Sequence, residues 1–247
     1  AGGQVHLSYE PEILGTGGGL KNLADFLGDQ PFLVINCDIV TDVNLTEIFQ
    51  AHREQALATL VLHHFPRFNQ VWRNAAGHIA GFGQPCPFDA VGPPLAFTGI
   101  QVISPRLLAR MPPGKVINII DQYKEAIAAG EKIAALVPQG HFWQDIGTPE
   151  AYLEVHRRLL AGQVPDVARF FPPLIDPWLG EGVILGDRVC CAGGVSIGPR
   201  VQIGAGVSLK NTVIWAAARI DAEVNLRDCI VGQGAWVRHS AQGQCLL

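Results

Sequence analysis

The sequence of 247 residues predicts a layered α/β domain followed by a parallel β-helix. Strand-like apolar runs alternate with helical segments in the first part, an order typical of a mostly parallel sheet. In the second part, valine recurs at every sixth position from Val183 to Val213, with glycines at matching offsets. Such hexads predict a β-helix in which three hexads form one turn. We expect about three turns.

The first part is organised around residues 31–40, which read PFLVINCDIV. The apolar run 32–35 is of the length and type expected for a buried parallel strand. The remaining elements are predicted from similar patterns. We expect strands at 5–9, 58–63, 97–103 and 132–137, a hairpin over 71–82, helices at 20–27, 45–55, 121–129 and 150–161, and loops at 10–19 and 84–94.

Domain bounds follow from a change in composition. Prolines become frequent after Val164, and the hexads begin near Gly182 and continue with slips to Val237. We therefore expect an α/β domain over 1–163, a linker over 164–181 and a β-helix over 182–247.

Charge and composition exclude several classes of protein. The net charge of −4 provides no basic surface for nucleic acid. No apolar run approaches the ~18 residues of a membrane-spanning helix, and the start lacks a signal pattern. Six cysteines without CxxC spacing indicate neither a disulfide framework nor a zinc site. We expect a soluble cytoplasmic protein.

Asp38 is the first candidate functional residue. It follows the apolar run, and in open α/β sheets ligands bind beyond the carboxyl ends of strands. The alternative is that Asp38 caps the following loop or helix.

Several segments occur together in a recognisable order. They are GTGGGL at 15–20, the strand ending in Asp38, FTGI at 97–100, FWQDIGTPEAY at 142–152, and then the hexads. In this order they resemble the sugar-1-phosphate nucleotidyltransferases (NDP-sugar pyrophosphorylases), and look most similar to bacterial mannose-1-phosphate guanylyltransferases. The resemblance covers nearly the whole chain. It implies a Rossmann-like nucleotidyltransferase domain, N-terminally incomplete here, followed by a left-handed parallel β-helix of hexapeptide repeats.

The resemblance also implies a reaction and its residues. A sugar-1-phosphate oxygen attacks the α-phosphorus of a nucleoside triphosphate, and pyrophosphate leaves. Asp38 and Asp145 map to the family's catalytic acids that bind Mg²⁺, although Asp145 has the alternative of capping the turn at Gly147. The nucleotide-binding positions are Glu10, Leu14, Gly15, Thr16 and Gly17, and the sugar-binding positions are Thr98 and Gly99.

Two of these assignments have local alternatives. A carboxylate at Glu10 suits the N1–H and N2–H₂ edge of guanine, which leads to the hypothesis that the base is guanine; Glu10 is alternatively a solvated loop residue. Thr98 and Gly99 are alternatively explained by packing at a β-bulge.

The family's Gly-x-Gly-Thr-Arg loop and Pro-Lys segment are not found in the sequence, which starts without methionine. We therefore expect an N-terminally incomplete chain with impaired catalysis, since such a loop stabilises charge in the transition state. The stretch 81–85 also lacks the lysine that many relatives place before the sugar-binding strand.

Two other functions stay open. A hexapeptide acyltransferase would use His239, the one histidine of the repeats, as its base. A non-catalytic regulatory or scaffold homologue would keep the fold and use the β-helix for assembly, with Trp178, Trp215 and Trp236 either as a contact surface or as core. In either the enzyme or the scaffold, we expect a homo-oligomer formed through the β-helix.

Overall fold

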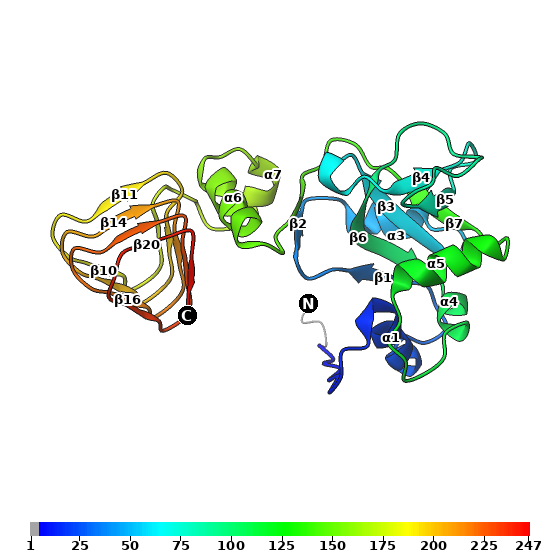
Figure 1. Ribbon diagram of the computed structural model, residues 1–247, viewed down its shortest axis with the longest axis horizontal. Coiled ribbons are helices and arrows are strands. Elements are labelled where there is room, and N and C mark those ends of the chain that lie inside the picture. The colour runs from blue at the N-terminus through cyan, green and yellow to red at the C-terminus, as the bar shows by residue number, and fades with distance from the viewer. Residues whose placement is uncertain (1–4) are drawn as a thin grey trace. The chain divides into compact units, whose positions relative to one another are not determined.

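The computed structural model describes residues 5–247 and divides into two compact units (Figure 1). Unit 1 holds the described residues up to Cys37 together with Val43–Gly140, and unit 2 holds Asp38–Asp42 together with His141–Leu247. This packing divides the chain differently from the expected bounds of 163 and 181. Residues 141–163 pack in unit 2, with the repeats, rather than in unit 1.

Unit 1 is a mixed α/β domain built on a four-stranded sheet of order β1-β6-β3-β7. The strands are β1 (Phe32–Ile35), β6 (Ala96–Ile103), β3 (Ala58–His63) and β7 (Ile133–Leu136). Only β3 and β7 pair in parallel, whereas β6 is antiparallel to both β1 and β3. The expectation of a mostly parallel sheet is therefore wrong. The residue patterns located these four strands correctly in the sequence, but they did not show that β6 lies between β1 and β3 in the sheet.

Strand β1 also differs from its predicted environment. Among the described residues 5–247 it pairs with β6 alone, from Phe32 opposite Ile103 to Ile35 opposite Ile100. It is thus an edge strand of this sheet, and its residues are half-buried or exposed rather than fully buried. The apolar run identified the strand but not its position in the sheet.

Helices cover this sheet and a small hairpin flanks it. The hairpin is β4 (Val71–Arg73) with β5 (Ile79–Phe82), as predicted. The helical elements are α1 (Gly15–Asn22), α2 (Ala24–Leu27), α3 (Leu45–Ala51), the 3₁₀ turn η1 (Pro66–Phe68), α4 (Pro105–Ala109) and α5 (Ile119–Ala128).

Two predictions near the N-terminus are wrong. Residues 5–9 form no strand, and their apolar side chains are exposed. The glycines of 15–19 are not a loop, because α1 begins at Gly15 and contains them. Low helix propensity suggested a loop, but packing of α1 on the segment around Ile117 overrides that preference.

The core of unit 1 lies where β3, β6 and β7 pack against α5. Leu60, Ile103 and Ile133 are fully buried there, and Tyr123 on α5 reaches across to donate a hydrogen bond to Gln101 Oε1 at 2.5 Å. Burial raises the pKa of the Tyr123 hydroxyl above its ordinary value.

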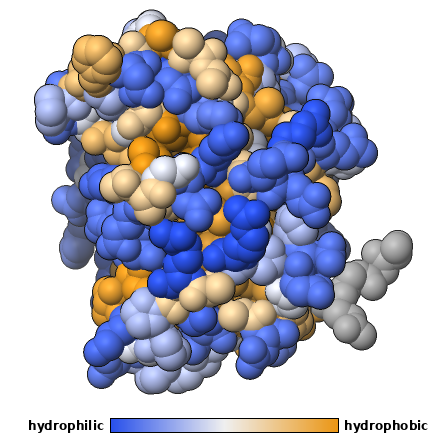
Figure 2. Space-filling model, turned by 90° about the vertical axis from the view of Figure 1, so that its right-hand side faces the viewer, coloured by the Kyte–Doolittle hydropathy of each residue, from blue (hydrophilic) through white to orange (hydrophobic). Residues whose placement is uncertain are grey.

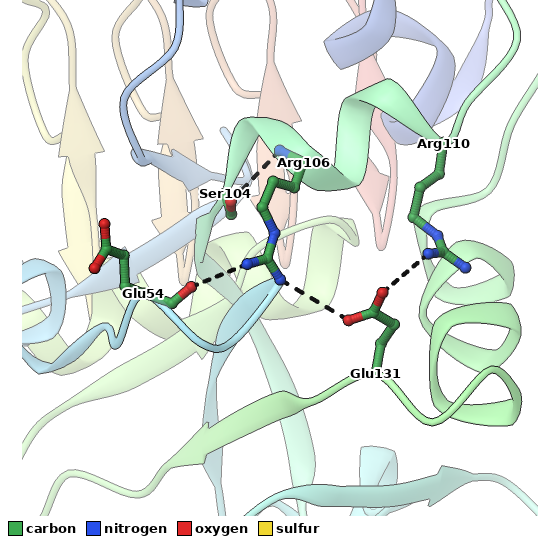
Figure 3. A network of polar contacts seen from close by, with 5 residues as sticks. All are labelled: Glu54, Ser104, Arg106, Arg110 and Glu131. Atoms are coloured by element: carbon green, nitrogen blue, oxygen red, sulfur yellow. Dashed lines mark hydrogen bonds and ion pairs between the residues drawn. The ribbon is translucent and has the colours of Figure 1, made fainter.

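A polar network closes the end of the sheet at which β6 terminates (Figure 3). Arg106 on α4 donates to the Glu54 carbonyl at 3.4 Å and approaches Glu131 at 3.8 Å, and Arg110 binds Glu131 at 3.2 Å. Ser104 Oγ caps the start of α4. Such exposed ion pairs contribute up to about 1 kcal/mol each. These contacts connect α4 and the residue after it to Glu54, which precedes β3, and to Glu131, which precedes β7.

Unit 2 begins with a two-stranded antiparallel ribbon of β2 (Ile39–Thr41) and β8 (Trp143–Asp145). Helices α6 (Pro149–Leu160) and α7 (Pro165–Ala168) follow β8. Helix α6 begins with Thr148, whose hydroxyl accepts from Ala151 N, and with Pro149 at its first position.

The rest of unit 2 is a parallel β-solenoid of about four turns, one more than expected. Successive strands of a sheet pair in parallel, for example Ile184 with Gln202 and Cys191 with Leu209. The three sheets are formed by β10-β13-β16-β19, by β11-β14-β17-β20 and by β21-β18-β15-β12-β9. Their strands are β9 (Trp178–Leu179), β10 (Ile184–Leu185), β11 (Cys190–Ala192), β12 (Ser196–Ile197), β13 (Gln202–Ile203), β14 (Ser208–Lys210), β15 (Val213–Ile214), β16 (Arg219–Ile220), β17 (Asn225–Arg227), β18 (Ile230–Val231), β19 (Trp236–Val237), β20 (Ala241–Gln242) and β21 (Cys245–Leu246).

The hexad pattern correctly predicted most of the solenoid interior. Val195, Val201 and Val207 are fully buried in its core, where each coil stacks its aliphatic residues on the next. Val213 is buried as well, but it pairs with Ser196 and is therefore out of register with these three valines. Glycine allows neighbouring coils to approach closely, since a Cβ at Gly198 would lie 2.8 Å from Ala216 N. The solenoid starts at β9, before the expected start at residue 182. The sequence pattern did not indicate this first strand because it lacks a valine in register with the hexads.

The three tryptophans of the linker and repeats are not core residues. Trp178 is half-buried, Trp215 is 46% exposed and Trp236 is 51% exposed. The Trp236 ring packs instead against Arg238, whose guanidinium carbon lies 3.6 Å from the ring centroid.

One face of the molecule is shown in Figure 2, where hydrophilic side chains predominate and apolar ones gather in small groups between them. Within the described part of the chain, residues 5–247, we find no helix with the length and apolar character needed to cross a membrane.

Candidate functional site

The two acids singled out by sequence, Asp38 and Asp145, lie together in unit 2. Asp38 precedes β2 and Asp145 ends β8, and the antiparallel register sets Ile39 opposite Asp145. The Ile146 N–H donates to the Asp38 carbonyl at 2.8 Å, which continues the pairing past the last strand residue. Although 107 positions separate them in the numbering, the register makes the two acids neighbours.

Their carboxylates converge beside Gly147. A Cβ built on Gly147 would lie 3.4 Å from Asp38 Oδ2 and 3.4 Å from Asp145 Oδ1. Both oxygens therefore border one small space that the glycine leaves open. Asp38 and Gly147 are exposed and Asp145 is half-buried, so the space is open to solvent.

The donor set fits magnesium. Mg²⁺ prefers hard oxygen ligands and is usually held by one or two carboxylates, with waters and phosphate oxygens completing its shell. Across residues 5–247 we find no cluster of three or more His, Cys, Asp or Glu side chains arranged for a metal. A pair of carboxylates at an open space is the arrangement expected of a cation shared with a phosphate ligand, rather than of an all-protein cage.

The capping alternatives for the two acids have different outcomes. The cap of α3 is Asn44, whose Oδ1 accepts from Thr46 N and Glu47 N, so Asp38 does not cap that helix. Asp145 does accept a hydrogen bond from Gly147 N at 3.2 Å. That bond shapes the turn before α6 and uses one of the lone pairs of Asp145 Oδ1, which leaves oxygen capacity for a cation.

Residues of α6 pack beside this ribbon. Arg158 lies over the Phe142 ring, 4.7 Å from its centroid, and donates to Gln144 Oε1 at 3.3 Å. Gln144 Nε2 in turn donates to the Ala151 carbonyl at 3.2 Å. His156 packs on Tyr152 at 4.7 Å between ring centroids, and burial lowers the pKa of His156.

The predicted nucleotide positions lie in unit 1, at the start of α1. Glu10 Oε2 accepts a hydrogen bond from Leu14 N at 3.1 Å, and its other oxygen lies against Gly19. Glu10 is thus a half-buried residue that orders the start of a helix, not a solvated loop residue. Thr16 is exposed. A role of these residues in base binding stays a prediction.

The glycines of α1 have a structural explanation in unit 1. Gly17 N donates to the Ile117 carbonyl at 2.9 Å, and a Cβ at Gly17 would lie 2.6 Å from Ile117 Cγ2. Gly15 has φ +69°, a conformation that favours glycine. The glycines let α1 approach the chain at Ile117 closely, whatever further contact they make with a ligand.

Thr98 and Gly99 lie at an irregularity of unit 1's sheet. The β3–β6 register shifts between Leu60 and Leu62, and the buried Thr98 hydroxyl donates to the Val61 carbonyl at 2.9 Å. Gly99 has φ +77°, and a Cβ there would lie 2.8 Å from Asn36 Cγ. This geometry matches the β-bulge alternative, and sugar contact by these residues stays a prediction.

Sequence reasoning missed three residues. Asn36 packs on Gly99, Gly147 leaves the space between the acids, and Asp42 binds the backbone of Phe142 at 2.7 Å. Only Asp42 had a usable signal, a second acid four positions after Asp38. His239, the candidate acyltransferase base, is exposed in a turn of the solenoid.

Comparisons with known proteins agree with the resemblance seen in the sequence. No family model matches the chain. Mannose-1-phosphate guanylyltransferase of Mycobacterium tuberculosis is 27% identical over 233 residues, which cover 89% of this chain and 62% of that protein. UTP–glucose-1-phosphate uridylyltransferase of Synechocystis is 26% identical over 262 residues, covering 97% of this chain and 64% of that protein.

Solved structures include HddC from Yersinia pseudotuberculosis, with a TM-score of 0.49, 18% identity, and coverage of 66% of this chain and 65% of that one. The chain spans somewhat less than two thirds of the length of the two curated relatives above. Curated relatives of this kind recur, at about this level of identity, over most of the chain. Over most of its length, the chain is similar in sequence to sugar-1-phosphate nucleotidyltransferases.

Proposed function

We propose that this chain takes part in nucleotidyl transfer, in which a sugar-1-phosphate and a nucleoside triphosphate give an NDP-sugar and pyrophosphate. The observation that carries the proposal is the convergence of Asp38 and Asp145 at the space beside Gly147. The relatives support the reaction class, since they are named a mannose-1-phosphate guanylyltransferase and a UTP–glucose-1-phosphate uridylyltransferase.

In this proposal Asp38 and Asp145 hold Mg²⁺, which when bound neutralises charge on the phosphate oxygens. The protein's own contribution is positioning. The β2–β8 register fixes the two carboxylates relative to each other, and the Gly147 N–H orients Asp145 Oδ1 by a 3.2 Å hydrogen bond. Preorganised charges of this kind supply much of the rate acceleration in phosphoryl chemistry, where covalent help is small.

The proposals for the base and for the sugar rest on Glu10 and on Thr98 and Gly99, respectively. Guanine remains the proposed base, because the second oxygen of Glu10 has acceptor capacity beyond its contact with Gly19. Relatives named for guanylyl and for uridylyl transfer match at similar identity, so they favour neither base. Thr98 and Gly99 remain the proposed sugar-contact positions.

The test is release of pyrophosphate with Mg²⁺ across four nucleoside triphosphates, paired with mannose-, glucose- and N-acetylhexosamine-1-phosphates. We expect Asp38→Asn and Asp145→Asn to lower turnover at least a hundredfold, and Asp187→Asn, an exposed acid of the solenoid, to leave it unchanged. Because the sequence contains no Gly-x-Gly-Thr-Arg segment, we expect slow turnover by this chain alone. Rapid turnover that survives both site substitutions would refute the proposal.

We also propose self-association through the solenoid. Trp215 and Trp236 on the solenoid are 46% and 51% exposed, and exposed aromatic side chains are enriched in contacts between protein chains. Analytical ultracentrifugation over a range of concentrations tests this, and a purely monomeric chain at high concentration would contradict it.

A further inference from the structure

The ribbon that carries both acids is very short. β2 and β8 pair over three residues each, with Thr41 opposite Trp143 at one end and Ile39 opposite Asp145 at the other. A two-stranded ribbon of this size is at best marginally stable by itself. A slip of one residue would turn its side chains to opposite faces and separate the acids. Convergence of the two carboxylates therefore depends on whatever fixes this register.

The two ends of the ribbon are closed differently. At the acid end, closure is by backbone alone, through the bond from Ile146 N to the Asp38 carbonyl. At the other end, Phe142 is held on both sides. Its N–H donates to Asp42 Oδ1 at 2.7 Å, and its carbonyl accepts from Thr41 Oγ1 at 2.6 Å and from Asp42 N at 3.4 Å.

The Asp42 bond is the strongest of these closures on physical grounds. It is short, its acceptor is ionised, and Asp42 is half-buried, so the bond is charge-assisted and partly shielded from water. It is also specific for register, because in a slipped ribbon the Asp42 carboxylate would face a different backbone group.

We propose that Asp42 is a positioning residue for the Asp38–Asp145 pair, acting through its bond to Phe142 rather than on the cation. The inference rests on the proposed function, since it takes these two acids as the metal ligands. Direct ligation by Asp42 is disfavoured by the register. Phe142 lies just before β8 and is three residues from Asp145, about 10 Å at ~3.4 Å per residue of extended chain.

The test is calorimetric titration of the chain with Mn²⁺, used as the probe for the site. Asp42→Ala removes the acceptor, and we expect the Mn²⁺ affinity to fall about tenfold or more, as for other residues that orient metal ligands. Asp42→Asn keeps an oxygen acceptor without the charge, so its Mn²⁺ affinity should fall by less than that of Asp42→Ala. Amide hydrogen exchange at Phe142 should speed up in Asp42→Ala and much less in Asp42→Asn.

A matched control separates positioning from general loss of stability. Asn44 is also a polar residue bound to backbone amides, but it caps α3 in unit 1. Asn44→Ala should lower the melting temperature while leaving Mn²⁺ affinity unchanged. Thr41→Val removes the second side-chain bond to Phe142 and should weaken Mn²⁺ binding to a smaller extent, which keeps the inference testable should Asp42→Ala not fold.

The outcomes distinguish the inference from the function on which it rests. If Asp38→Asn loses Mn²⁺ binding while Asp42→Ala and Thr41→Val bind like the parent, the positioning role is wrong and the metal site stands. If Asp42→Asn binds as weakly as Asp42→Ala while the Phe142 amide still exchanges at the parent's rate, the charge of Asp42 acts at the cation and positioning is again wrong. If Asp38→Asn binds Mn²⁺ unchanged, the proposed metal site itself fails.

Discussion

The substitution Gly147→Ala tests cation binding at the proposed metal site separately from the stability of the fold. The added methyl would lie 3.4 Å from Asp38 Oδ2 and from Asp145 Oδ1, an ordinary van der Waals distance, and Gly147 does not have a positive φ. The backbone therefore accepts alanine without strain. Replacing glycine at such a position typically stabilises a protein by about 0.4–1 kcal/mol, because the unfolded chain loses freedom.

The same methyl should damage cation binding. It fills the space bordered by both carboxylate oxygens and displaces the water that Mg²⁺ retains in its shell. We expect an affinity loss of about tenfold, equivalent to ~1.4 kcal/mol. The substitution should thus raise or preserve stability while it weakens binding.

The assay pairs Mn²⁺ calorimetry with thermal unfolding in the absence of metal. Gly232→Ala is the matched control, a glycine of the solenoid at which the new methyl would meet the flexible Leu247 side chain at 3.0 Å. It should leave Mn²⁺ affinity unchanged. Gly147→Ala that folds normally and binds Mn²⁺ as tightly as the parent would refute the placement of the cation beside Gly147.

Two further predictions concern stability. In chemical denaturation, Gly99→Ala should lower the free energy of unfolding more than Gly130→Ala does. Both glycines have positive φ, where alanine is strained by about 1–2 kcal/mol, but only at Gly99 would the new Cβ also lie 2.8 Å from Asn36. Equal losses in the two variants would contradict the close contact. Burial lowers the pKa of His156 from 6.5, so its neutral ring favours folding above that pH, and this stability is lost as the pH falls through the lower folded-state pKa. The unfolding free energy should therefore drop more steeply from pH 8 to pH 5 in the parent than in His156→Gln, and parallel curves would show that the ring against Tyr152 titrates normally.

The solenoid was the most predictable part of the fold, because its signal is both local and repeated. Val195, Val201 and Val207 recur at the same place in successive repeats and are fully buried in the core, so one pattern predicts strand, turn and interior together. The start of the solenoid was placed too late because β9 lacks the valine that precedes β10 and β11.

The sheet of unit 1 was predictable as strands but not as a topology. Apolar runs located β1, β3 and β6, whereas their order and direction depend on long-range pairing, such as Phe32 with Ile103, that no local pattern encodes. The ribbon of β2 and β8 was missed entirely, since three-residue strands separated by a hundred positions carry no periodicity.

The candidate site shows the same division. Asp38 was identified from its place after an apolar run and Asp145 from the family resemblance, whereas the register that brings them together appears only in the structure. The glycines of α1 pack closely on the chain at Ile117, and the Thr98 hydroxyl binds the Val61 carbonyl. The sequence alone could not distinguish these packing roles from ligand binding, because a small residue or a hydroxyl suits either role.

The most direct measurement is a Mn²⁺ titration of the parent chain beside Asp38→Asn and Asp145→Asn, with Asp187→Asn as control. We expect one Mn²⁺ site in the parent and in the control, and loss of that site in each of the two variants. Binding of equal strength in all four proteins would contradict the central claim that these two acids form one cation site.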